Sequence, residues 1–144
     1  MDAPILTKEE LAARFAAGGL CSQNTMEPWA EALGYDAEEL HRMGAAFGGG
    51  MFRGDTCGAV TGALMVLGLV FGDDTELTKQ KAAEFQAAFT EKLGTTICRE
   101  LLGFDFSVPG ELEKARASGK MLDVCPTAVR TASEILREML RDVD

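Results

Sequence analysis

Four cysteines are the residues of this chain whose type and positions point to chemistry. They are Cys21, Cys57, Cys98 and Cys125, and the chain has no others. No two of them form a CxxC motif, so their spacing matches neither a zinc ribbon nor a ferredoxin cluster. Any shared function must therefore come from the local setting of each thiol and from the fold.

The local settings of the four cysteines agree, because each is predicted at or just inside the N-terminus of a helix. Three of them follow short runs rich in glycine and threonine, and the fourth precedes proline, a residue favoured at the first helical position: Gly18-Gly19 before Cys21, Gly54-Asp55-Thr56 before Cys57, Gly94-Thr95-Thr96 before Cys98, and Pro126 after Cys125. Unpaired N–H groups and the helix dipole stabilise an anion at such a position. We therefore expect lowered thiol pKa values and convergence of at least two thiols in one pocket.

Two chemistries fit converging thiolates. In the first, a pair of cysteines cycles between dithiol and disulfide, and four cysteines allow three sets of pairings. In the second, Cys21, Cys57, Cys98 and Cys125 together bind zinc, another soft metal or an iron–sulfur cluster without turnover. We favour dithiol chemistry, since metal ligands drawn from separate helices are less usual than a local CxxC. A third reading treats the cysteines as small buried hydrophobic residues.

An all-α fold is expected to position these residues. The stretch from Gly58 to Gly72 is apolar nearly all round, and its small residues allow neighbouring helices to approach closely. No segment shows the alternating pattern of a strand. We predict that residues 1–144 form a single helical domain of about six to seven helices around a buried central helix, residues 57–72.

The remaining helices are predicted from caps and apolar spacing. Thr7 and Glu10 form a capping box, and a second helix runs from Cys21 to about Leu33 with Pro28 in its first turn or at a kink. One further helix is expected from Asp36 to the glycine run at 48–50, and another from Thr75 to about Leu93. A short helix should end at Gly103, a helix should begin at Pro109 in a polar connection, and the last helix should begin at Cys125. The glycine run 48–50 also has the composition of an anion-binding nest, although it lacks the other parts of a phosphate loop.

Three further side chains are candidates for a role at the site. Arg53 and Arg99 flank Cys57 and Cys98, where a guanidinium would stabilise a thiolate; a surface ion pair with Asp55 or Glu100 is the equally weighted alternative. His41 is the only histidine and is expected on a solvated face. It therefore offers little support for a Cys–His nucleophilic pair.

The composition restricts the class of partner. The formal net charge is -9 and the isoelectric point is about 4.6, which argues against nucleic acid or an anionic membrane surface. The longest apolar run is too short to span a bilayer, and the N-terminal segment lacks the pattern of a signal peptide. We expect a cytoplasmic protein, where thiols are kept reduced and cysteines are more often reactive groups or ligands than structural staples.

The motifs also resemble a known family. The core Cys57-Gly58-Ala59-Val60-Thr61-Gly62 is followed along the chain by Cys98-Arg99-Glu100-Leu101-Leu102-Gly103 and by Cys125-Pro126. In this order they are similar to the C_GCAxxG_C_C family of redox-active proteins. Members usually read Cys-Ala-Gln and then aliphatic residues at the first cysteine, where this chain has Cys21-Ser22-Gln23-Asn24.

The resemblance implies a redox-active thiol protein. Its site would consist of Cys57, Cys98, Cys125 and Cys21, with Gly58, Arg53 and Arg99 as the candidate residues in contact with a bound group. Its activity would be that of a thiol–disulfide oxidoreductase or oxidant sensor. The expected partner is a redox protein or a small thiol.

Overall fold

The computed structural model describes residues 1–144 and confirms the all-α expectation. It contains eight α-helices, one more than the upper number expected, and one short turn, η1: α1 (Lys8–Ala16), α2 (Cys21–Leu33), α3 (Ala37–Gly44), η1 (Gly50–Gly54), α4 (Gly58–Phe71), α5 (Thr75–Leu93), α6 (Cys98–Leu102), α7 (Glu111–Ser118) and α8 (Met121–Leu140). The connection before α8 forms the separate helix α7 because Gly110 and Gly119, with φ of 86° and 73°, bound it at both ends.

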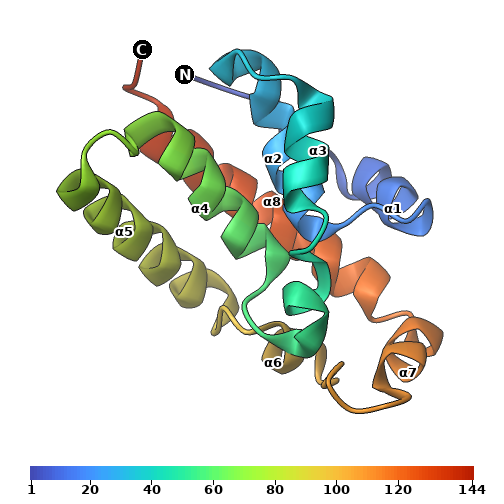
Figure 1. Ribbon diagram of the computed structural model, residues 1–144. Helices are drawn as coiled ribbons and strands as arrows, with labels where there is room; N and C mark the ends of the chain where they lie inside the picture. Colours follow the sequence, from blue (N-terminus) through green and yellow to red (C-terminus); the bar gives the residue numbers. More distant parts are fainter.

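Helix α4 is the predicted central helix. It packs against α2, α5 and α8 (Figure 1), and its residues Ala59, Val60, Ala63 and Val66 are fully buried. These residues belong to one hydrophobic cluster that extends from Ala3 to Leu140. The apolar composition of α4 on all sides is thus explained by neighbours on several sides.

Helix α2 begins and ends where the sequence predicts. Its start is fixed by Gln23, whose side-chain Oε1 accepts a hydrogen bond of 3.1 Å from the Leu20 N–H, and Gly34 ends it with a φ of 76°. Pro28 lies in the interior of the helix, so the first-turn alternative was wrong, and a kink at this proline stays a prediction. An interior proline costs about 3 kcal/mol, which the complete burial of Met26 and Trp29 on the same helix offsets.

Two other helix boundaries differ from expectation. Helix α3 ends at Gly44, before the glycine run. Helix α8 begins at Met121 rather than at Cys125, so Pro126 lies within it. Residues 121–124 extend the helix because they are ordinary helix formers with no glycine or proline to stop them, and Asp123 provides a negative charge in the first turn.

The N-terminal ends of several helices gather at one end of the bundle. Figure 1 shows the start of α4 beside η1 and α6, away from the turn that joins α4 to α5. Thr56 and Ile97 form an isolated antiparallel bridge just before α4 and α6. No helix in the structure is both long and apolar enough to cross a membrane.

Candidate functional site

Three of the four cysteines occupy the predicted positions at helix N-termini. Cys21 is the first residue of α2, Cys57 is the N-cap of α4, and Cys98 is the first residue of α6. The prediction was wrong for Cys125, which lies in the second turn of α8 because that helix begins upstream. All four thiols are free; Cys125 is half-buried and the other three are buried.

The starts of α4 and α6 are joined by backbone hydrogen bonds. The Cys57 N–H donates to the carbonyl of Thr96 at 2.7 Å, and the Cys98 N–H donates to the carbonyl of Asp55 at 2.6 Å. These bonds flank the bridge between Thr56 and Ile97. Two cysteines that are far apart in the sequence are therefore held next to one another by their own main chain.

Glycines in the CGAxxG motif bring α2 against α4. A Cβ atom on Gly58 would lie 2.2 Å from Cys21 Sγ and 2.8 Å from the Phe47 carbonyl oxygen. A Cβ atom on Gly62 would lie 2.8 Å from the Ser22 carbonyl oxygen. Only glycine leaves room for this contact, so Gly58, which we expected to border the site, acts by admitting the Cys21 sulfur.

Cys21 and Cys57 form a hydrogen-bonded pair. The Cys57 S–H donates to the Cys21 sulfur, as do the backbone N–H groups of Gly49, Ser22 and Gly58. These donors, with Cys57 the most important, outweigh burial and lower the pKa of Cys21 from 9.0 to about 7. Cys21 is therefore the thiol that ionises near neutral pH, at the helix N-terminus where an anion is favoured.

The other three thiols stay protonated at neutral pH. The pKa of Cys57 is raised well above 9.0, because its proton is held by Cys21 and because it is buried. Burial, with a smaller contribution from the charge of Cys21, raises the pKa of Cys98 to about 12 and that of Cys125 still further. The expectation that every thiol pKa would be lowered was thus wrong for three of them. Desolvation dominates at Cys98 and Cys125, and the interaction with the Cys21 sulfur holds the proton on Cys57.

The four thiols lie within electrostatic range of one another, and we refer to them together as the cysteine cluster. The Cys21 charge acts on Cys57, Cys98 and Cys125, and Cys98 also acts on Cys57 and Cys125. Because a first negative charge disfavours a second nearby, the cluster carries a single thiolate near neutral pH. That arrangement provides one nucleophile, Cys21, with the protonated Cys57 thiol beside it.

A left-handed turn next to the pair was not predicted from the sequence. Residues 49–52 all have positive φ, between 57° and 62°, including Met51 and Phe52. The Gly49 N–H donates to Cys21 from the first residue of this turn. The glycine run was the available signal: it suggested a nest for an anion, and here the anion is the Cys21 thiolate.

The two arginines at the site contact a carboxylate. Arg53 Nε lies 3.5 Å from Asp55, and the Arg99 guanidinium lies 2.9 Å from the same carboxylate and also donates to the carbonyl of Gly54. Both arginines thus form the surface ion pair with Asp55 that the sequence analysis gave as the alternative to stabilising a thiolate. The two side chains form the exposed rim of the cluster, and a role for Arg53 or Arg99 toward a bound group stays a prediction.

The metal-binding alternative has no preformed site. No group of three or more His, Cys, Asp or Glu side chains is arranged to hold a metal ion. The sole histidine, His41, is exposed and pairs with Glu27. Zinc or iron–sulfur binding by the four cysteines stays a prediction.

Comparison with known proteins identifies the family of the chain. The family model described as "Putative redox-active protein (C_GCAxxG_C_C)" matches residues 20–139, and this span includes all four cysteines. Searches of curated proteins and of solved structures gave no match. The chain therefore belongs to the C_GCAxxG_C_C family of redox-active proteins.

Proposed function

We propose that this protein is a dithiol–disulfide redox protein in which Cys21 and Cys57 form the working pair. The observation that carries the proposal is the close approach of the Cys21 sulfur to Gly58, the residue that follows Cys57, together with the interaction between the two thiols, which lowers the pKa of Cys21 and raises that of Cys57. A low pKa gives the attacking sulfur its thiolate, and the adjacent thiol is placed to resolve the mixed disulfide.

The reaction needs a disulfide-bearing partner, either a redox protein or a small-molecule disulfide RSSR. The Cys21 thiolate attacks one partner sulfur, the S–S bond of the partner breaks, and RS⁻ leaves with the electron pair of that bond. Cys57 then gives its proton to this leaving thiolate and attacks the Cys21 sulfur, which expels the second RS⁻; this thiolate is protonated by water. Two protein thiols are oxidised to one disulfide, and one partner disulfide is reduced to two thiols.

The other two cysteines support this pair in our proposal. Because the pKa values of Cys98 and Cys125 are raised, neither thiol competes as a nucleophile near neutral pH. Replacing Cys125 by serine should therefore leave the two-electron oxidation of the pair in place.

A redox titration tests the proposal. The reduced protein is equilibrated in mixtures of reduced and oxidised glutathione, and free thiols are counted by mass after alkylation. We expect a two-electron transition in the wild type and in Cys125→Ser, and its loss in both Cys21→Ser and Cys57→Ser. A two-electron transition that survives in Cys57→Ser would exclude this pair.

A further inference from the structure

A polar pocket lies outside the cysteine cluster, on the surface formed by α1, α2 and α3. Its volume is about 380 Å³, and Ala17 is the one hydrophobic residue among those that line it. Arg14, Asn24, Glu27 and His41 line it together with Gly19. A pocket of this size is at the lower end of the range found for small-molecule sites, and its lining suits a polar ligand.

One side chain of this pocket lacks a hydrogen-bond partner. Asn24 is only 3% exposed, and its amide nitrogen Nδ2 is buried without any partner. The missing N–H of Pro28 also leaves the Asn24 carbonyl without its helical donor. Buried polar groups in proteins are almost always paired, so an unpaired donor at a pocket indicates a group that the ligand satisfies.

Gly19 keeps this part of the pocket open. A Cβ atom at Gly19 would lie 3.4 Å from Asn24 Nδ2 and 2.9 Å from the carbonyl oxygen of Arg14. Any other residue would fill the space beside the amide. A side chain at position 19 would therefore clash with the Arg14 carbonyl oxygen and lie against the amide of Asn24.

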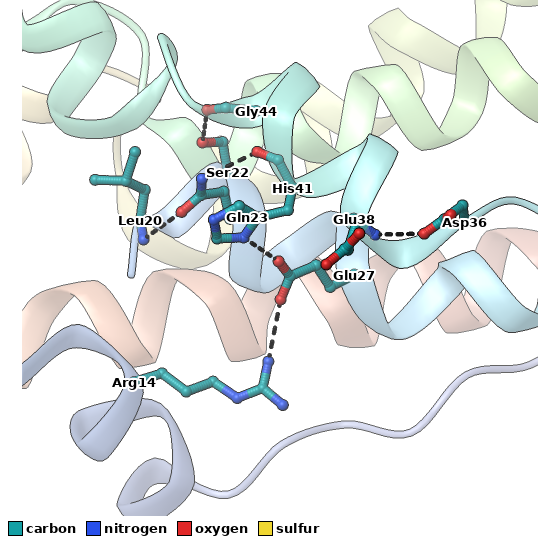
Figure 2. A network of polar contacts seen from close by, with 9 residues as sticks. All are labelled: Arg14, Leu20, Ser22, Gln23, Glu27, Asp36, Glu38, His41 and Gly44. Atoms are coloured by element: carbon teal, nitrogen blue, oxygen red, sulfur yellow. Dashed lines mark hydrogen bonds and ion pairs between the residues drawn. The ribbon is translucent and has the colours of Figure 1, made fainter. Parts of the chain in front are cut away.

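The charges of the pocket are arranged around Glu27. Figure 2 shows its carboxylate between Arg14 and His41: one oxygen lies 3.4 Å from the Arg14 guanidinium and the other 2.5 Å from His41 Nδ1. A guanidinium has five N–H donors and a carboxylate accepts at about four positions, so both groups retain capacity for a ligand. Gln23, in contrast, is engaged by the Leu20 N–H and the His41 carbonyl and acts as a support for α3.

We propose that this pocket binds the ammonium–carboxylate head group of a free α-amino acid. The ligand carboxylate would take the donors of Arg14 and Asn24, and its ammonium would take Glu27. A simple carboxylate would meet the negative charge of Glu27 as well as Arg14, and a simple amine would meet the positive charge of Arg14 as well as Glu27. A zwitterion balances both charges and supplies the acceptor that Asn24 lacks.

Titration by nuclear magnetic resonance tests the proposal on the intact ¹⁵N-labelled protein. Each standard amino acid is added singly, and the side-chain amide signals of Asn24 are followed; acetate and ethylamine serve as the two half-ligands. We expect saturable shifts with at least one amino acid and at least about tenfold weaker binding of both half-ligands. Absence of a saturable shift with every amino acid, or equal binding of acetate, would overturn the assignment.

Two variants separate binding from structure. Asn24→Leu removes the unpaired donor at similar volume, so it should raise the melting temperature of the free protein while weakening binding at least about tenfold. Arg14→Gln changes an exposed side chain and should weaken binding by a similar factor, whereas Arg141→Gln, at the end of α8, should not. Unchanged affinity in Arg14→Gln would overturn the proposal even where Asn24→Leu does not fold. The cysteine pair plays no part in this test, so its outcome is independent of the redox proposal.

Discussion

Replacing Cys57 by alanine should raise the pKa of Cys21. The Cys57 S–H is the largest of the effects that lower this pKa from 9.0 to about 7. That difference corresponds to about 2.7 kcal/mol of preference for the thiolate. Without the donor, burial is opposed only by the three backbone N–H groups, and we expect the pKa to return toward 9.0.

The effect is large enough to measure directly. With a pKa of about 7, half of Cys21 is thiolate at pH 7, whereas a pKa of 9.0 leaves about 1%. The thiolate fraction at pH 7 should therefore fall roughly fiftyfold in Cys57→Ala. Thiolate ultraviolet absorbance as a function of pH reports this change, because Cys98 and Cys125 do not ionise in the same range.

Serine at the same position provides the matched control. Cys57→Ser removes the second sulfur but keeps an O–H group that can donate to the thiolate. We expect its Cys21 pKa to stay much closer to 7 than that of the alanine variant. A Cys21 pKa near 7 in Cys57→Ala, or the same high pKa in both variants, would refute the assignment of Cys57 as the donor.

Three further predictions concern stability. Gly58→Ala should destabilise the reduced protein by about 1–3 kcal/mol or more, because its Cβ would meet Cys21 Sγ and the Phe47 carbonyl. Gly68→Ala, whose Cβ would have nothing within 4 Å, should instead stabilise α4 by about 0.5–1 kcal/mol. Urea denaturation compares the two variants, and equal effects would contradict the close approach of α2 and α4 at Gly58. Between pH 7 and 9 the unfolded Cys21 thiol retains a proton that the folded protein has released, so the free energy of unfolding of the reduced protein should rise by up to about 2.7 kcal/mol. Above pH 9 it should fall, because the raised pKa values of the other thiols dominate there. If the difference in unfolding free energy between the wild type and Cys21→Ala is flat from pH 7 to 9, the Cys21 pKa is not lowered. Met51→Gly should raise the melting temperature, since glycine relieves about 1 kcal/mol of backbone strain at a φ of 60°. A lower melting temperature would show that contacts of the Met51 side chain outweigh that strain.

The helices could be predicted because their signals are local. Thr7 and Glu10 form the expected capping box, and the apolar stretch of α4 becomes the central helix. Proline was a less reliable guide, because its cost is repaid by burial that no local pattern reveals. Pro28 and Pro126 both lie within helices for this reason.

The cysteine cluster could be predicted only in part. Helix N-termini indicated where Cys21, Cys57 and Cys98 lie, and the small residues of the CGAxxG motif indicated close packing. Which thiols pair depends on contacts between distant segments, such as the bridge between Thr56 and Ile97, and spacing carries no information on these. The pKa values depend on burial and on the number of converging donors, so one thiol ionises readily and the others do not.

The polar pocket was not predicted at all. Arg14, Asn24, Glu27 and His41 come from three helices, and each has an ordinary surface role when considered alone. Asn24 is the residue that stands out once the fold is known, because its amide nitrogen is buried without a partner. A polar residue on a mostly buried helix gives no indication of this in the sequence.

Mapping the disulfide that forms on mild oxidation tests the central claim most directly. Cleavage after Lys and Arg places each cysteine on its own peptide, within residues 15–42, 54–79, 93–99 and 121–130. Mass spectrometry of the protein oxidised by about one equivalent of a disulfide reagent, then alkylated and digested without reduction, identifies the linked pair. We predict a link between the peptides that contain Cys21 and Cys57, and a first-formed link that joins Cys98 or Cys125 to any other cysteine would contradict it.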